Sequence, residues 1–442
     1  MTDDSEPRNR PSSTTPRVET VMSWTVDEPA VRRRGRSWRL GVVVAALIAV
    51  VLAFWGVPRL WAVFDDGMRG PYGRFPQPVA AQPPVHSAQR VASALPKSAV
   101  IYGGLAIMPA RDGVRAVDIV TGKVYWRYTK GAWVLVGGVD RSTGDVFLES
   151  TSRELVKVNI RSGKIRWSQK VPHIGRPDES VVPDADPATL ALINSDGMTG
   201  ISRATGKVRW TKKWPGTCPY EDIFSHVAVL PGTLAVACND YDAPDNAVAG
   251  FDPATGATRW ALRVSQLSAG TSRPHEMVDA LGLVSGRLAV AAGDTTDLLD
   301  PATGRIVTKR RWKGKQAAAF DDGRQVSLCE DKKDHAICGL DPATGGQLWR
   351  TPIPESGHLP QGSESLAVAD GRVYIVSDVP RNTGFELIVF DGRTGRVLSR
   401  NPISGHTTFI YGVTDGIVAI GVTDTDLYAE RPDIRGTRRL PS

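Results

Sequence analysis

The chain contains four cysteines, and their positions favour disulfide chemistry. They are Cys218, Cys238, Cys329 and Cys338. An even number of cysteines outside the cytoplasm is typical of disulfide pairs, and the hairpins expected around them predict Cys218–Cys238 and Cys329–Cys338. Free buried thiols are the alternative. A zinc site is disfavoured, because the nine-residue spacing and the lack of paired histidines do not suit zinc.

Other groups that could do chemistry do not form a recognisable site. The acid pairs Asp184/Asp186 and Asp424/Asp426 lack the other oxygen ligands and the glycine of a calcium loop. No glycine-rich phosphate loop leads from a strand into a helix. None of the seven histidines forms a metal-ligand pair with another. We therefore expect no catalytic, cofactor-binding or metal-binding residue. The histidines are His86, His173, His226, His275, His335, His358 and His406.

One acidic loop is the most plausible site for a cation or a basic partner. Its polar residues are Asn239, Asp240, Asp242, Asp245 and Asn246. Loops carry binding functions while a rigid scaffold positions them, so the value of this loop depends on the elements around it.

The β-strands around this loop are indicated by seven copies of one short turn. The glycines of consecutive copies lie 41 to 50 residues apart. A repeat of this length with several strands per unit predicts a β-propeller. The copies are Asp118–Trp126, Asn159–Trp167, Ser202–Trp210, Asp252–Trp260, Asp300–Thr308, Asp341–Trp349 and Asp391–Ser399.

Each turn has a clear local mechanism. The opening Asp or Asn can accept backbone N–H groups two residues on, and the glycine supplies the left-handed residue that restarts the partner strand. A tryptophan four residues after the glycine recurs in five copies and is expected to pack between blades. Thr308 and Ser399 replace it, which predicts weaker contacts there. The repeat residues are Gly122, Gly163, Gly206, Gly256, Gly304, Gly345, Gly395, Trp126, Trp167, Trp210, Trp260 and Trp349.

The repeats predict an all-β, eight-bladed propeller of four-stranded antiparallel blades, with seven blades as the alternative. In the fourth unit the expected strands are 223–230, 233–239, 247–252 and 257–262. The last unit, 409–430, lacks its outer strand. Residues 90–95 could supply it and close the ring, which would remove two exposed sheet edges.

The predicted ring has one face of short, uniform turns and one face of long, variable loops. The long connections all join the second strand to the third or one blade to the next. We therefore expect the long-loop face to bind partners.

The N-terminal region predicts a single membrane anchor. Leu40–Val57 is an uncharged apolar run of eighteen residues, long enough to span a bilayer. Arginines crowd its N-terminal side, which places the N-terminus in the cytoplasm and the propeller outside. A cleaved signal peptide is the alternative. The expected organisation is a disordered tail (1–36), an anchor (37–61), a proline-rich, stiff linker (62–89), the propeller (90–436) and a short tail (437–442).

The overall composition gives little information about partners. The net charge of +7 in a chain of 442 residues is weakly in favour of acidic partners and does not indicate nucleic acid binding.

The Asp-x-x-Thr-Gly-x-x-x-Trp pattern resembles the tryptophan-docking repeat of the pyrroloquinoline-quinone (PQQ) propeller family, over roughly residues 97–430. With its anchor, the chain also looks like membrane-anchored actinobacterial members of that family whose function is unknown. The family includes quinoprotein alcohol dehydrogenases and non-catalytic assembly proteins.

The resemblance implies two kinds of function. Quinoprotein dehydrogenases have two adjacent cysteines and a calcium site of Glu, Asn and Asp; here no cysteines are adjacent, and no residues can be assigned those roles. We therefore expect a non-enzymatic, membrane-anchored binding or scaffold protein at the cell envelope that holds no cofactor, with a protein or envelope component as its partner. A PQQ-dependent dehydrogenase is the alternative.

Overall fold

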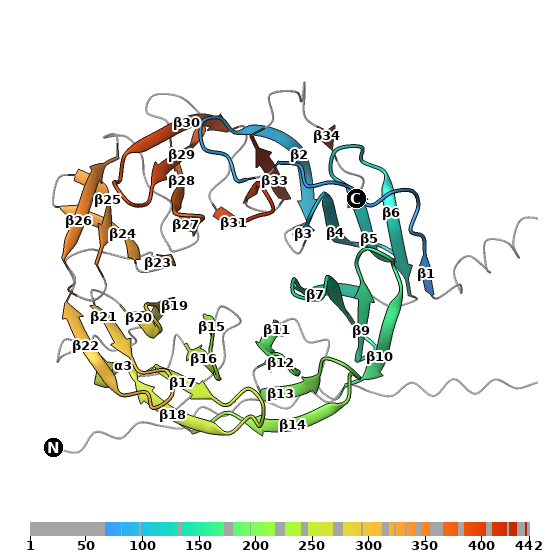
Figure 1. Cartoon of the computed structure of the whole chain (residues 1–442), viewed down its shortest axis with the longest axis horizontal. Coiled ribbons are helices and arrows are strands. Elements are labelled where there is room, and N and C mark those ends of the chain that lie inside the picture. Colours follow the sequence, from blue (N-terminus) through green and yellow to red (C-terminus); the bar gives the residue numbers. More distant parts are fainter. Residues whose placement is uncertain are drawn as a thin grey trace, which may run out of the picture. The chain divides into compact units, whose positions relative to one another are not determined.

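The fold is a ring of β-sheets. A computed structural model of the chain describes most of residues 67–439. The strands in this described part form eight sheets, which lie side by side around a central axis (Figure 1). The sheets correspond to the eight predicted blades. Within 67–439, the residues that are not described are 81, 97–98, 131–133, 172–179, 195, 217–225, 240–245, 268–276, 293–294, 312–317, 322–323, 332–333, 342–343, 345, 354–365, 379–383, 404–408, 422–423 and 431–437.

The first four sheets follow one another along the chain. The first contains β1 (Gly67–Arg69), β3 (Val100–Tyr102), β4 (Leu105–Ala110), β5 (Gly113–Asp118) and β6 (Val124–Thr129). The second contains β7 (Val134–Asp140), β8 (Asp145–Ser150), β9 (Glu154–Asn159) and β10 (Ile165–Lys170). The third contains β11 (Ser180–Asp186), β12 (Thr189–Asn194), β13 (Gly197–Ser202) and β14 (Val208–Lys213). The fourth contains β15 (Val227–Leu230), β16 (Thr233–Cys238), β17 (Ala247–Phe251) and β18 (Thr258–Arg263).

The fifth to seventh sheets repeat the same order. The fifth contains β19 (Val278–Val284), β20 (Arg287–Ala292), β21 (Thr295–Leu299) and β22 (Ile306–Arg311), and the short helix α3 (Val264–Leu267) precedes it. The sixth contains β23 (Ala318–Asp321), β24 (Arg324–Asp331), β25 (Asp334–Leu340) and β26 (Gln347–Pro352). The seventh contains β27 (Leu366–Ala369), β28 (Arg372–Asp378), β29 (Phe385–Asp391) and β30 (Val397–Ile403).

The eighth sheet joins the two ends of the described chain. It contains β31 (Phe409–Thr414), β32 (Ile417–Gly421), β33 (Asp424–Ala429), β2 (Gln89–Pro96) and β34 (Arg438–Arg439). β2 pairs antiparallel with β33, so the prediction that residues 90–95 supply the missing outer strand is confirmed. β34 pairs parallel with the free edge of β2, so part of the expected C-terminal tail adds to the sheet.

The repeated turns form as their sequence predicts. In the turn after β5, Oδ1 of Asp118 accepts the N–H groups of Val120 and Thr121 at 2.8 and 2.9 Å. The N–H of Gly122 donates to the backbone oxygen of Asp118 at 2.8 Å, and Gly122 has a φ of 67°. A left-handed φ favours glycine because it has no Cβ. The Asp-Gly turns at 370–371 and 415–416 have positive φ at both residues, as tight hairpin turns require.

The repeat tryptophans tie each sheet to the next. In four cases the indole Nε1–H donates to a backbone oxygen in the following sheet, and the acceptor always comes directly after the residue that opens the next turn. These bonds are Trp126 to Ile160 (2.8 Å), Trp167 to Arg203 (3.0 Å), Trp260 to Pro301 (2.9 Å) and Trp349 to Gly392 (3.0 Å). The predicted packing role of the tryptophans is therefore confirmed for these residues.

Trp210 is the exception, and it gives a testable contrast. Its Nε1 is buried without a hydrogen-bond partner. We expect Trp260→Phe to lower the free energy of unfolding by about 1 kcal/mol more than Trp210→Phe, because only the first change removes an indole hydrogen bond. The carbonyl of Pro301 then keeps only the hydroxyl of Thr233 as a side-chain donor. Denaturant unfolding of the two variants checks this. Equal losses would contradict a role for the indole hydrogen bond.

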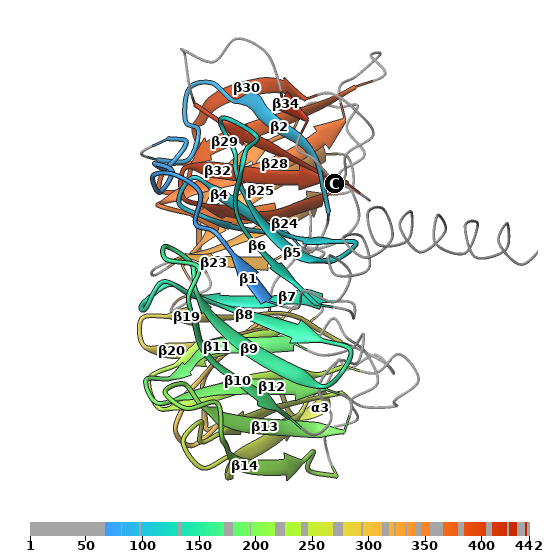
Figure 2. The same ribbon diagram turned by 90° about the vertical axis from the view of Figure 1, so that its right-hand side faces the viewer.

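The expected linker instead packs against the ring over its described residues. Residues 70–80 and 82–88, called the strap below, lie on the short-turn face (Figure 2). The N–H of Tyr72 donates to the backbone oxygen of Tyr125 at 2.7 Å, and the Phe75 ring lies 5.7 Å from the Tyr125 ring. Val79 is buried in the core between the first and eighth sheets. These apolar side chains gain more from burial than an extended spacer in water would.

The far end of the strap contacts the seventh and eighth sheets. Oε2 of Glu430 accepts the N–H groups of Val85 at 2.8 Å and His86 at 3.3 Å. The N–H of Ala88 donates to Oδ1 of Asn401 at 2.8 Å. The strap therefore crosses the turn face at the place where the two ends of the chain close the ring.

The predicted anchor, Leu40–Val57, and the expected tail, 1–36, lie outside the described residues. Among the residues that the structure describes, no helix is long and apolar enough to cross a membrane.

Candidate binding face

The candidate binding loop has a buried asparagine at each end. It joins β16 to β17 in the fourth sheet. Asn239 is 6% exposed and Asn246 is 0% exposed, so neither amide belongs to an open binding surface, in contrast to the prediction. Both are buried because they hold the base of the loop. Asp240, Asp242 and Asp245 lie outside the described residues.

Asn239 clamps the neighbouring sheet through both ends of its amide. Its Nδ2 donates to the backbone oxygen of Val278 at 2.9 Å, and its Oδ1 accepts the N–H of Val278 at 3.0 Å. Val278 is the first residue of β19, so one side chain fixes the fourth sheet to the fifth. Buried backbone groups need such partners, and this pair satisfies an N–H and a C=O at once.

Asn246 holds the other end of the loop. Its backbone oxygen accepts the N–H of Val264 at 2.7 Å, at the start of α3. Val264 and Leu267 are buried in the core that the fourth and fifth sheets share. The two ends of the acidic loop are therefore anchored on well-packed elements of the long-loop face.

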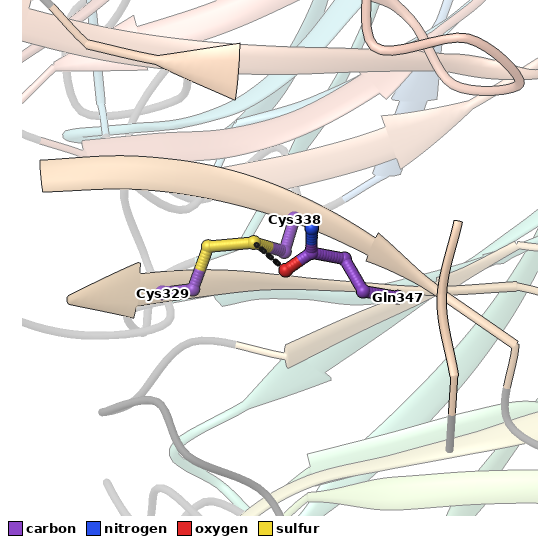
Figure 3. Close-up of a disulfide and its surroundings, with 3 residues drawn as sticks. All are labelled: Cys329, Cys338 and Gln347. Carbon is purple, nitrogen blue, oxygen red and sulfur yellow. Dashed lines mark hydrogen bonds between the residues drawn. A yellow bond between two sulfur atoms is a disulfide. The ribbon is translucent and has the colours of Figure 1, made fainter. Parts of the chain in front are cut away.

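A disulfide links two strands of the sixth sheet. Cys329 on β24 and Cys338 on β25 form a disulfide with a Cα–Cα distance of 5.9 Å (Figure 3), as predicted. The side-chain oxygen of Gln347 lies 3.6 Å from Sγ of Cys338. Cys238, at the end of β16, is also disulfide-bonded. Its predicted partner, Cys218, lies outside the described residues.

Three of the four acids that might have suggested calcium contact other groups of the protein. The carboxylate of Asp184 lies 3.5 Å from Arg203, and that of Asp426 lies 3.1 Å from Arg90. Oδ1 of Asp186 accepts the N–H of Ala188 at 2.9 Å. No group of three or more His, Cys, Asp or Glu side chains in the described part of the chain could hold a metal ion.

The innermost strands expose aliphatic side chains. β7, β15 and β19 lie among the strands nearest the ring axis (Figure 1). On them, Leu135, Val229 and Leu283 are 37%, 40% and 44% exposed. Aliphatic side chains of this kind offer neither charge nor hydrogen bonds to a ligand.

A buried ionic network on the turn face was not predicted. Arg203 forms an ion pair with Asp140 and donates to Oγ of Ser142 at 2.9 Å. Lys157 lies 3.1 Å from Asp145 and 3.9 Å from Asp140. Because Asp140 and Asp145 flank the β7–β8 turn and Arg203 follows β13, the network joins the second sheet to the third.

The network holds Asp140 in its charged form. Burial alone would raise the pKa of this carboxyl. Hydrogen bonds from Arg203, Ser142 and Thr143, with the charge of Arg203, outweigh burial and lower the pKa to about 2. The sequence carried a signal for this turn, because residues 140–144 read Asp-Arg-Ser-Thr-Gly and resemble the repeated turns. This copy joins the first two strands of its sheet, β7 and β8, whereas the repeated turns join the third strand to the fourth. The contacts of this turn hold two sheets together, so its role is structural.

Comparisons with known proteins agree with this architecture. A family model described as outer membrane protein assembly factor BamB matches residues 110–297 and 292–400. No curated protein matches the chain.

The solved structures of similar fold include the following three. BamB from Moraxella catarrhalis is 15% identical, with a TM-score of 0.54, over 77% of this chain and 99% of that one. The computationally designed Ika8 protein is 17% identical, with a TM-score of 0.53, over 77% and 99%. Sqt1 from Saccharomyces cerevisiae is 11% identical, with a TM-score of 0.52, over 80% and 100%. With a family model covering most of the ring and a propeller built on its tryptophan-docking turns, the chain belongs to the PQQ-like β-propeller family.

Proposed function

We propose that this protein is a non-catalytic binding or scaffold propeller, held at the cell membrane by Leu40–Val57, with the ring outside the cytoplasm. Its long-loop face engages a protein or another component of the cell envelope. The strap carries this proposal, because it occupies the turn face across the first, seventh and eighth sheets and leaves the long-loop face for a partner. The disulfide between Cys329 and Cys338 supports an oxidising location.

A PQQ-dependent dehydrogenase is the alternative within the family, and the described residues give it less support. The quinone is a tricarboxylate that needs cationic and amide donors together with a metal ion. The described inner strands instead expose Leu135, Val229 and Leu283, together with the acid Asp184 of β11. The described chain offers no cluster of metal-binding side chains either. These observations support a binding role more than a redox role.

A pull-down of the full chain from an envelope extract in mild detergent tests the proposal. A partner captured by the wild type should be lost when Asp240, Asp242 and Asp245 are changed together to alanine. Asp112→Ala is the matched control, because Asp112 is an exposed acid in a different sheet, with 47% of its side chain accessible. Capture by the triple variant equal to that by Asp112→Ala would rule out the acidic loop. Capture of no specific partner would overturn the binding role.

A further inference from the structure

The outer strands that follow the repeated turns carry charge of one sign. β6, β10, β14, β18, β22, β26 and β30 contain 13 Lys or Arg residues and no Asp or Glu. The whole chain is nearly balanced, with 54 basic and 47 acidic residues. The lack of acidic residues is therefore a property of these outer strands, which lie at the circumference of the ring (Figure 1).

The charge is densest on two neighbouring sheets. Residues 164, 166, 168 and 170 read Lys-Arg-Ser-Lys, and residues 207, 209, 211 and 213 read Lys-Arg-Thr-Lys. All of these residues are exposed. Each blade therefore presents a row of three exposed cations within seven residues of chain, with a β-bulge at the arginine of each row. These two rows, together with Lys212, are called the basic rim below.

In the part of the chain that the structure describes, the lysines of the basic rim have no partners. Lys164, Lys170, Lys207, Lys212 and Lys213 form no ion pair or side-chain hydrogen bond within the described part of the chain. The acid opposite Lys170 in the adjoining strand, Glu154, is already bound to Lys130 and Ser168. The lysines of the rim, unlike Arg166 and Arg209, which contact Asp145 and Thr189, therefore keep their positive charge available to an external anion.

Protection of the sheet edge explains part of this pattern. Lysines on an edge strand prevent edge-to-edge pairing with other chains. Charge of either sign would give that protection, and a single charge per strand would suffice. The consistent sign and the repeated Lys-Arg-x-Lys row need a second reason, which is charge complementarity to a ligand.

We infer that the basic rim binds a linear polymer that carries closely spaced phosphate groups. Lysine is a hydrated point charge that attracts phosphate without a fixed geometry, and rows of lysines match a flexible chain of repeated anions. Nucleic acid fits less well, because single strands use exposed aromatic rings for base stacking, and Trp167 on β10 is only 9% exposed. The site is separate from the acidic loop of the proposed function.

Binding of fluorescent long-chain inorganic polyphosphate to the full chain in non-ionic detergent tests the inference. The rim variant changes Lys164, Lys170, Lys207 and Lys213 to glutamine. The control variant changes Arg111, Lys123, Arg393 and Arg396, which are exposed basic residues outside the two rows, so both variants lose four charges. We expect the rim variant to lose affinity by about tenfold or more, and its slope of log K against log salt to fall by about 3. The control should lose much less.

Three results would overturn the inference. The first is equal loss in the two variants, which would mean that net charge alone attracts the polymer. The second is no binding of polyphosphate by the wild type. The third is rim-dependent binding of anionic lipid vesicles with no rim-dependent binding of polyphosphate, which would identify a bilayer as the partner. The Asp240/Asp242/Asp245 alanine variant should bind polyphosphate as the wild type does, so failure of the loop proposal is separable from failure of this one.

Discussion

Gly304→Ala should lower the free energy of unfolding by about 3 kcal/mol. Gly304 has a φ of 67°, which costs an alanine about 1 kcal/mol. A Cβ at this position would lie 2.6 Å from Cδ2 and Cγ of Trp260, and crowding of this kind in a packed site costs about 2 kcal/mol more. Trp260 cannot move away easily, because it is 8% exposed and its Nε1 is bonded to Pro301 in the same turn. Urea unfolding followed by tryptophan fluorescence measures the loss.

Gly286→Ala is the matched control. Gly286 has a φ of 73°, but a Cβ there would meet nothing within 4 Å. This variant should lose only the conformational part, about 1 kcal/mol. If both variants lose the same amount, the close approach of glycine to indole contributes nothing, and the glycines of the repeat serve the turn alone.

This double role explains why the fold could be predicted from the sequence. The turn glycine is needed for its φ and for the tryptophan of the preceding sheet, so Gly206, Gly256, Gly304 and Gly395 recur at a fixed place in each unit. Local hydrogen bonds of the turn and contacts between sheets thus depend on the same few residues. Strand positions followed from the turns, and β16 begins at Thr233 as expected.

The strap could not be predicted, because its partners are distant in sequence. The backbone oxygen of Gln77 lies close to Gly104, and that of Ala80 lies close to Gly416. A proline-rich segment without a periodic apolar pattern reads as a spacer. Its burial depends on turns of the first and eighth sheets that meet only when the ring closes.

The candidate site was predicted only in part, for a similar reason. Polar residues between two strands suggest an exposed loop, so the sequence predicts exposed side chains for Asn239 and Asn246. Asn239 is buried because the backbone of Val278, 39 residues later, needs both of its amide groups. The disulfide between Cys329 and Cys338 could be predicted, because β24 and β25 form a hairpin and bring the two cysteines close together.

Asp140→Asn should destabilise the protein by about 3 kcal/mol at pH 7, because it leaves the buried cations of Arg203 and Lys157 without their full counter-charge. Asp140 is 0% exposed, and Arg203 and Lys157 are 8% and 6% exposed. Denaturant unfolding at neutral pH measures the loss. Asp112→Asn is the control, since its pair with Arg115 is exposed and such pairs contribute well under 1 kcal/mol.

The effect of Asp140→Asn should also depend on pH. The pKa of Asp140 is lowered in the folded protein to about 2, from an ordinary value of 3.8. A carboxyl with a depressed pKa contributes stability above its unfolded pKa and loses that contribution as the pH falls through its folded pKa. The difference between wild type and Asp140→Asn should therefore be constant from pH 7 to about 5 and shrink between about pH 4 and 2. A difference that persists undiminished at pH 2 would show that the aspartate acts by shape and hydrogen bonding, and that its charge does not hold the second sheet to the third.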